Sequence, residues 1–191
     1  MTARVIVVDV FRHQPVIVGR NVRLEPLTPA VLEDYVRALD EPEVRRLTGS
    51  HATFDRPQIE RWLATRQDHH DRADWAIVRL TDEAFLGEAV LLDLDPQNES
   101  ASYRIWLAGP ELFGRGYGTE VTRLVVHYAL DGIGLHRLGL EVFDVNPRAR
   151  RVYEKCGFIL EGRLRDALLW QGKRQDTLLM AILRGDPRSA R

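Results

Sequence analysis

Apolar residues recur along this chain with two periods, and these separate the predicted helices from the predicted strands. Between residues 121 and 128 they fall at i, i+3, i+4 and i+7, the spacing of one helix face. Between residues 137 and 143 they fall at every second position, as in a half-buried strand. Applied to the whole chain, the two periods predict an α/β domain with a mixed sheet.

Capping and turn residues set the predicted boundaries. Thr28-Pro29 and Asn146-Pro147 each place a capping side chain before a proline suited to the first helical position, and Gly157 ends the second of these helices. The predicted elements are strands at 4–11 and 15–27, a helix from 29 to about 39, a short helix and loop at 40–55, a helix at 55–71, an antiparallel meander of strands at 75–80, 85–92 and 100–107, a helix after the glycines near 116, a strand at 137–143, a helix from 147, and strands at 158–169 and 174–183.

Length and composition indicate one domain. The chain has 191 residues with 45% hydrophobic content, enough for one sizeable core, and no linker or repeat divides it. We expect an amino-terminal extension over residues 1–18 that contains an extra strand, a main domain over 19–184, and a frayed polar tail over 185–191. The extra strand offers an edge for a second copy of the chain, so a homodimer is one expectation.

Charge and cysteine content exclude several classes of protein. The net charge of −1 does not favour electrostatic binding to nucleic acid or to a membrane surface. No apolar run approaches the roughly 20 residues that a membrane-spanning helix needs. The single cysteine, Cys156, excludes an internal disulfide and suits a reducing compartment, so we expect a cytoplasmic protein. The histidines lack the spacing of a metal site, and we expect no metal.

A glycine-rich loop at residues 112–120 carries the strongest chemical signal. Gly114, Gly116 and Gly118 stand at alternate positions, and the missing Cβ atoms let the backbone turn tightly and approach a ligand. The helix that follows contributes unpaired N–H groups and the positive end of its dipole. This pattern predicts a phosphate-binding loop, the alternative being a simple strand-to-helix connection.

Four segments, at 114–120, 136–142, 146–158 and 161–165, together resemble the GNAT superfamily of acetyl-CoA-dependent N-acetyltransferases. The last two are most similar to the subgroup that acetylates amino termini of ribosomal proteins. Phe113 stands where the wider superfamily often has Gln or Arg, and Ala149 where many subgroup members have Ser. The resemblance covers about residues 19–184. It implies a GNAT-like single domain whose mixed, mostly antiparallel sheet splays at the acetyl-CoA site and is flanked by helices.

The resemblance also implies where acetyl-CoA binds. Pantetheine would lie between the strands ending near Leu107 and Phe143, and the pyrophosphate would lie on the N–H groups of 114–119. The basic start of the helix after Asn146 suits a CoA phosphate, the alternative being a solvated face. The expected contact residues are Trp106, Leu107, Ala108, Phe113, Gly114, Arg115, Gly116, Tyr117, Gly118, Thr119, Asn146, Arg148, Arg151 and Tyr153.

Tyr153 is the candidate general acid, because the resemblance implies a hydroxyl that protonates the departing CoA thiolate; a packed aromatic is the alternative. Glu88 and Glu141 are the candidate general bases. A solvated strand face is the simpler explanation for Glu141, and a water relay can replace either carboxylate. An α-amine is far less basic than a lysine, so we expect the loss of either glutamate to cost little.

The sequence therefore predicts an enzyme that transfers acetyl from acetyl-CoA to a primary amine by direct attack, since no activated nucleophile is visible. The subgroup resemblance favours a protein amino terminus as acceptor; a polyamine or an antibiotic is the enzymatic alternative. A non-catalytic acyl-CoA-binding regulatory module is the alternative of a different class. We expect the acceptor pocket at the loops around 40–55 and at the final hairpin, where Trp170 and Asp176 are exposed candidates.

Overall fold

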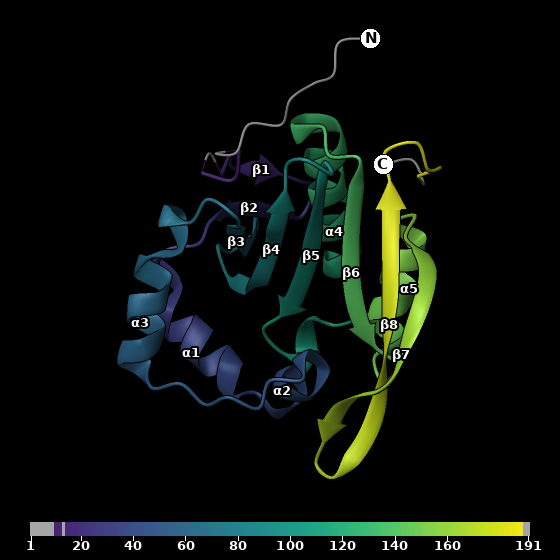
Figure 1. The fold of residues 1–191 in the computed structure, drawn as a ribbon. Helices are drawn as coiled ribbons and strands as arrows, with labels where there is room; N and C mark the ends of the chain where they lie inside the picture. Colours follow the sequence, from purple (N-terminus) through teal and green to yellow (C-terminus); the bar gives the residue numbers. More distant parts are fainter. Residues whose placement is uncertain (1–9, 13, 189–191) are drawn as a thin grey trace.

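One eight-stranded sheet runs through the part of the chain that the computed structural model describes, residues 10–12 and 14–188 (Figure 1). Its strands are β1 (Ile17–Val18), β2 (Val22–Pro26), β3 (Ala73–Arg79), β4 (Phe85–Asp95), β5 (Ser100–Leu107), β6 (Arg137–Phe143), β7 (Ile159–Trp170) and β8 (Lys173–Leu183). The spatial order is β1-β2-β3-β4-β5-β6-β8-β7, and only β5 and β6 are parallel neighbours. The predicted α/β fold with a mixed, mostly antiparallel sheet is confirmed.

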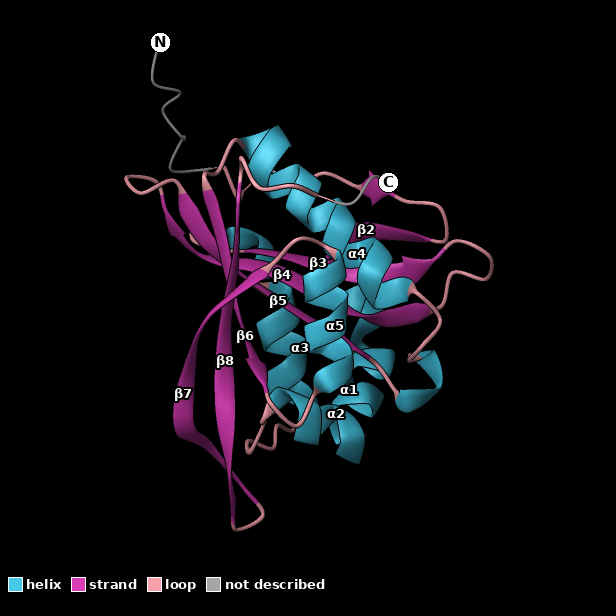
Figure 2. Ribbon diagram, turned by 90° about the vertical axis from the view of Figure 1, so that its right-hand side faces the viewer, coloured by secondary structure: helices cyan, strands magenta, loops and turns pink. Residues whose placement is uncertain are grey.

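Helices cover both faces of this sheet. The α-helices are α1 (Leu32–Asp40), α2 (Pro42–Thr48), α3 (Arg56–Ala64), α4 (Tyr117–His127) and α5 (Pro147–Lys155); 3₁₀ turns lie at Pro29–Val31, Arg66–Asp68 and Pro110–Leu112, and a π-helix at Tyr128–Ile133. Figure 2 shows α4 and α5 together on one side of the strands. Among the described residues, no helix is long and apolar enough to cross a membrane.

The two helical layers bury two separate cores. Because side chains alternate across a strand, Trp75 and Ile77 of β3 join the core under α4 and α5, whereas Ala76 and Val78 join the core under α1, α2 and α3. All four are buried, as the uninterrupted apolar run of this strand requires. The sheet therefore presents different side chains to its two faces.

Most predicted elements are confirmed near their predicted positions, and β5 and β6 have the predicted bounds. α5 begins as expected, with the Asn146 side chain accepting a hydrogen bond from the Ala149 N–H at 3.1 Å. The helix predicted over 55–71 ends earlier, at Ala64. Residues 4–9 of the strand predicted over 4–11 lie outside the described residues, and Val10 and Phe11 lie in a turn.

The single strand predicted over 15–27 is wrong, because the chain turns back at 19–21 and forms β1 and β2 instead. The cause lies far away in the sequence. The Glu120 carboxylate on α4 accepts hydrogen bonds from the main chain of Arg20 (2.6 Å) and from the main chain (2.8 Å) and side-chain amide (2.7 Å) of Asn21. Glu120 thus fixes this turn and holds α4 against the sheet.

Glu120→Ala is expected to lower the free energy of unfolding by about 2–3 kcal/mol, because several N–H groups lose a charged acceptor. Burial raises the pKa of Glu120, but the hydrogen bonds from Asn21 and Arg20 outweigh it and leave the pKa below its usual value. The contribution is therefore present above the unfolded pKa of about 4.3 and is lost as the pH falls through the lowered pKa. Urea unfolding at neutral and acidic pH measures it, with the exposed Glu111→Ala as control. An equal loss at both pH values would contradict this assignment.

The described part of the polar tail, residues 185–188, makes side-chain contacts with the domain. The Arg188 guanidinium donates hydrogen bonds to both carboxylate oxygens of Asp131, at 2.7 and 3.0 Å. The Asp186 carboxylate accepts one from the Leu183 N–H at 2.9 Å. These contacts attach residues 186–188 to β8 and to the end of the helix after α4.

Candidate active site

The strands β5 and β6 separate after three residue pairs. They pair from Ser100 with Arg137 to Ser102 with Gly139, after which β5 continues beside β4 and β6 beside β8. The edge of β5 beyond residue 102 therefore has no partner from β6. This separation produces the V-shaped opening expected between the strands that end at Leu107 and Phe143.

A cavity of about 410 Å³, here called the loop cavity, lies between α2, the end of β5, the loop at 112–119 and α5. All residues predicted to contact acetyl-CoA line it except Ala108 and Arg115. The Ala108 N–H instead donates to the Leu86 carbonyl at 2.8 Å. Val44 and Thr48 of α2 also line this cavity, which the sequence did not predict.

The glycines of the loop have the geometry of an anion cradle. Gly114 (φ 73°) and Gly116 (φ 89°) hold left-handed backbone, which favours glycine, and a Cβ on either would meet no atom within 4 Å. Gly116 caps α4 and has no side chain to accept a hydrogen bond, so within the described part of the chain the N–H groups of the first turn have no side-chain cap. The first turn of α4 thus presents N–H groups and a positive dipole end beside open space, which fits a pyrophosphate.

The basic side chains around the loop cavity differ in whether they already contact other protein groups or remain free to bind a phosphate. The Arg148 guanidinium stacks 4.5 Å from the Phe113 ring centre and lies 3.4 Å from the Glu43 carboxylate. Arg151 is exposed and has no ion-pair or hydrogen-bond partner among the described residues. Lys155 also lines the cavity, one helical turn beyond Arg151, and was not predicted. Arg151 is therefore the predicted cation best placed for a phosphate.

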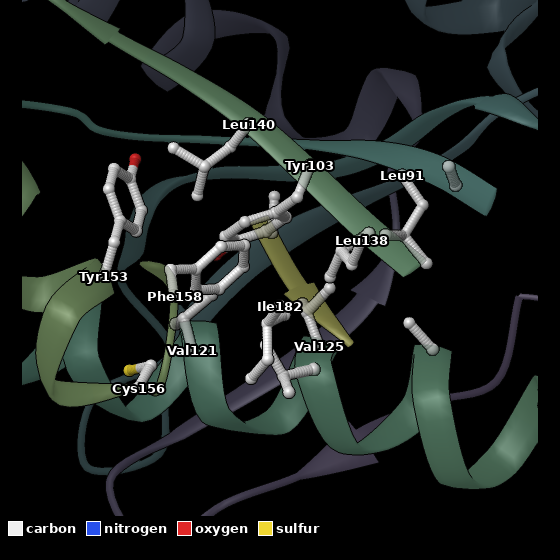
Figure 3. Packing of buried hydrophobic residues seen from close by; sticks show 14 of the residues in the cluster. Leu91, Tyr103, Val121, Val125, Leu138, Leu140, Tyr153, Cys156, Phe158 and Ile182 are labelled. Atoms are coloured by element: carbon white, nitrogen blue, oxygen red, sulfur yellow. The ribbon is translucent and has the colours of Figure 1, made fainter. Parts of the chain in front are cut away.

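Tyr153 lies at the junction of the loop cavity and the opening between β5 and β6. Its ring is buried and makes edge contacts with Phe158 (5.8 Å between ring centres) and Tyr103 (6.4 Å). Figure 3 shows the hydroxyl pointing away from α5, and it has no hydrogen-bond partner among residues 10–12 and 14–188. Burial raises the pKa of Tyr153, which keeps the hydroxyl protonated at neutral pH. Packing and proton donation are thus compatible in this residue.

A second cavity of about 490 Å³ lies in the opening itself and shares Tyr153 and Asn146 with the loop cavity. Glu141 lines it from β6, but its side chain is exposed and has no polar partner among the described residues. This placement agrees with a solvated strand face.

A third cavity of about 610 Å³, here called the aromatic cavity, lies between α1, α3 and the strands β4 and β5. Glu88 lies in its wall and is fully buried. Its Oε2 accepts hydrogen bonds from Trp106 Nε1 (2.6 Å) and the Tyr35 hydroxyl (3.3 Å), whereas its Oε1 has no hydrogen-bond partner among the described residues. Burial raises the pKa of Glu88 against the opposing effect of Arg104. Of the two predicted carboxylates, Glu88 is therefore the buried one, with a raised pKa and, within the described part of the chain, an unpaired oxygen.

The final hairpin differs from its prediction. Trp170 and Asp176 lie in β7 and β8 and line none of the three cavities. Asp176 accepts hydrogen bonds from Arg163 and from the Asp166 N–H, both at 2.9 Å, and Trp170 packs on His51. They tie the hairpin together and to the loop before α3. Within the described part of the chain, no group of three metal-ligating side chains is found.

Comparison with known proteins agrees with this geometry. Residues 21–159 match the family described as "Acetyltransferase (GNAT) domain". The chain is 31% identical over 115 residues to a spermidine N(1)-acetyltransferase of Vibrio cholerae, covering 60% of this chain and 66% of that protein. It is 31% identical over 105 residues to the "Putative ribosomal N-acetyltransferase YdaF" of Bacillus subtilis, covering 55% and 57%. The chain thus spans less than two thirds of each relative's length.

A solved structure has the same fold. The spermidine N-acetyltransferase of Vibrio cholerae in complex with CoA and spermine matches with a TM-score of 0.79 at 22% identity, over 87% of this chain and 97% of that chain. At this identity the likeness concerns the fold alone. The family match, in contrast, covers more than half of the sequence, including the glycine loop and α5. This chain belongs to the GNAT acetyltransferase family.

Proposed function

We propose that this chain transfers the acetyl group of acetyl-CoA to a primary amine. The observation that carries the proposal is the loop cavity, in which the left-handed glycines and the uncapped start of α4 face open space beside the separated strands. The names of two relatives, a spermidine and a ribosomal N-acetyltransferase, support acetyl transfer to nitrogen. The CoA in the complex of the structural relative supports the choice of acetyl donor.

In this proposal each residue of the site has one task. The N–H groups at 114–119 and Arg151 hold the phosphates of acetyl-CoA. The amine nitrogen attacks the thioester carbonyl carbon, so that an N–C bond forms and the C–S bond breaks. The amine proton passes to Glu88 Oε1, and the Tyr153 hydroxyl gives a proton to the departing sulfur. Solvent restores both groups, and no covalent enzyme intermediate forms.

The acceptor is either a protein amino terminus, which the subgroup resemblance favours, or a small amine. The name of one relative, the "Putative ribosomal N-acetyltransferase YdaF", supports a ribosomal acceptor, and the names of the spermidine N(1)-acetyltransferases support a small amine. Thiol release from acetyl-CoA in the presence of a panel of peptides and small amines tests the proposal. Binding of acetyl-CoA without any amine-dependent thiol release would instead favour the regulatory module.

Glu88→Gln is expected to lower kcat/KM on the order of 10²-fold, because the amide cannot accept the amine proton. The sequence alone led us to expect little cost; the burial of Glu88 and its free Oε1 change that expectation. Since burial raises the pKa of Glu88, activity should rise with pH above the ordinary carboxylate value of about 4.3. Glu141→Gln is the matched control, with an expected effect of about twofold or less. Equal effects of the two variants would remove Glu88 from the mechanism.

Arg151→Ala is expected to raise the KM for acetyl-CoA about tenfold, because it removes a charge-assisted contact with a phosphate. The neighbouring Arg150 offers a matched control, since it lies on the same helix but pairs with Glu154 at 2.8 Å and does not line the loop cavity. Steady-state kinetics at saturating amine measure both variants. If Arg150→Ala has the larger effect, the phosphate lies elsewhere on the helix.

A further inference from the structure

The walls of the aromatic cavity are mainly apolar. Tyr35 is at the centre of the wall, with its ring centre 5.1 Å from that of Trp106 and 5.5 Å from that of Trp62. Phe54 also lines the cavity and remains 54% exposed, an unusual exposure for a large aromatic side chain. The cavity therefore offers stacking surfaces that an apolar ligand would cover.

Only one polar atom of this wall is both fully buried and without a partner, among the described residues that line it. This atom is Glu88 Oε1, whose carboxylate already receives hydrogen bonds at Oε2. A buried oxygen without a partner costs free energy, and an N–H donor from a ligand removes that cost. An ammonium or amine group is the complementary donor.

The charges around the cavity do not suit a polycation. Glu88 is the only carboxylate among the described residues that line it, and the Arg104 guanidinium lies 3.7 Å from the Glu88 carboxylate. Arg72 lines the cavity as well and bonds to the buried Asp74 behind it. A ligand with several positive charges would place its additional charges beside two guanidinium groups, and like-charge contacts cost several kcal/mol.

The cavity lies next to the proposed acetyl-CoA site. Val44, Thr48 and Trp106 line both the aromatic cavity and the loop cavity. A ligand with its amine at Glu88 Oε1 would have that amine beside the shared wall and its body among the aromatic rings.

We propose that the acceptor is a primary amine attached to an apolar, preferably aromatic, body, and that the aromatic cavity binds this body. The inference rests on the proposed acetyl transfer and names its substrate class. It separates this chain from its spermidine-acetylating relatives, whose named substrate is a polycation. A free arylalkylamine and a peptide with an aromatic first residue share this chemistry.

The test compares kcat/KM for β-phenylethylamine, a peptide beginning with Phe, a peptide beginning with Ser, and spermidine. Burial of an aromatic group contributes about 1.5–3 kcal/mol, so at least one aromatic amine should exceed spermidine and the Ser peptide by about tenfold or more. The two aromatic amines distinguish a free amine from an amino terminus. A preference for spermidine or for the Ser peptide would overturn the proposal while leaving acetyl transfer intact.

Two variants test whether the aromatic cavity causes the preference for aromatic amines. Phe54→Ala and Trp62→Leu should each reduce kcat/KM for the aromatic amine several-fold and leave the KM for acetyl-CoA unchanged, because neither residue lines the loop cavity. Leu164→Ala, on the edge strand β7, is the control: Leu164 is 44% exposed and lines none of the three cavities. Equal effects of Phe54→Ala and Leu164→Ala would overturn the proposal.

Calorimetry keeps the two proposals separate if no amine is acetylated. Calorimetry would then measure the binding of β-phenylethylamine in the presence of CoA. If the wild type binds this amine and Phe54→Ala binds it more weakly, the proposed amine site stands and acetyl transfer is rejected. Absence of such binding, or tighter binding of spermidine, would reject the amine site as well.

Discussion

Gly116→Asp is expected to weaken acetyl-CoA binding by a factor of about 10² or more. The new side chain would point into the open space before α4, where the pyrophosphate is proposed to lie. Like charges brought together at a binding site cost several kcal/mol, and each 1.4 kcal/mol corresponds to about tenfold in Kd. The φ of 89° adds backbone strain for any side chain. Isothermal calorimetry with acetyl-CoA measures the change.

Two controls separate charge from strain. Gly116→Asn introduces a side chain of similar shape without the charge, at a residue type that tolerates left-handed backbone, and should retain more affinity than the aspartate. Gly172→Asp, in the turn between β7 and β8, places an aspartate at a φ of 78° with open space around it, remote from the loop cavity. It should bind acetyl-CoA normally. Unchanged affinity in a folded Gly116→Asp would refute the phosphate assignment.

Tyr153→Phe is expected to lower kcat by about 10²–10³-fold while the Kd for acetyl-CoA changes little. The substitution keeps the ring that packs on Phe158 and Tyr103 and removes only the hydroxyl, which has no partner among the described residues. Because burial raises the pKa of Tyr153, the wild-type enzyme should not lose activity through its ionisation at mildly alkaline pH. Thiol-release kinetics measure kcat, and calorimetry measures the Kd for acetyl-CoA.

Tyr103→Phe is the matched control, since Tyr103 is equally buried and in contact with Tyr153. Its hydroxyl is already hydrogen-bonded to Thr122 Oγ1 at 3.1 Å, so its loss should cost about 1 kcal/mol of stability and little turnover. Wild-type turnover in Tyr153→Phe would leave Tyr153 with a packing role alone. The proton would then reach the thiolate through water.

The sequence patterns predicted those helices and strands whose positions are determined by residues close together in the sequence. Asn146-Pro147 specifies the start of α5 through a cap within the helix itself, and the alternating residues of β6 specify its face. The hairpin of β1 and β2 was missed because its turn is held by Glu120, about 100 residues away. A local sequence pattern cannot reveal these hydrogen bonds, because Glu120 lies too far along the chain from the turn that it holds.

The candidate site shows the same division. The glycine loop was predicted because its signal is contiguous, and most of its residues line the loop cavity. The loops around 40–55 were named for the acceptor pocket, and Phe54 of that range lines the aromatic cavity. Tyr35 and Trp62 were not identified, because they have the spacing of ordinary core residues on two separate helices. Glu88 was identified as a candidate but not distinguished from Glu141, since a strand pattern does not reveal that one lies beneath helices and the other faces solvent.

Mass spectrometry of the reaction products tests the central claim most directly. The purified chain is incubated with acetyl-CoA and the panel of amines, and the masses of the amines and of the intact protein are then measured. Acetyl transfer by direct attack predicts that an amine gains one acetyl group on its nitrogen, in amount equal to the CoA released, while the protein mass stays unchanged. CoA release with no acetylated amine, or an acetyl group retained on the protein as an intermediate, would contradict it.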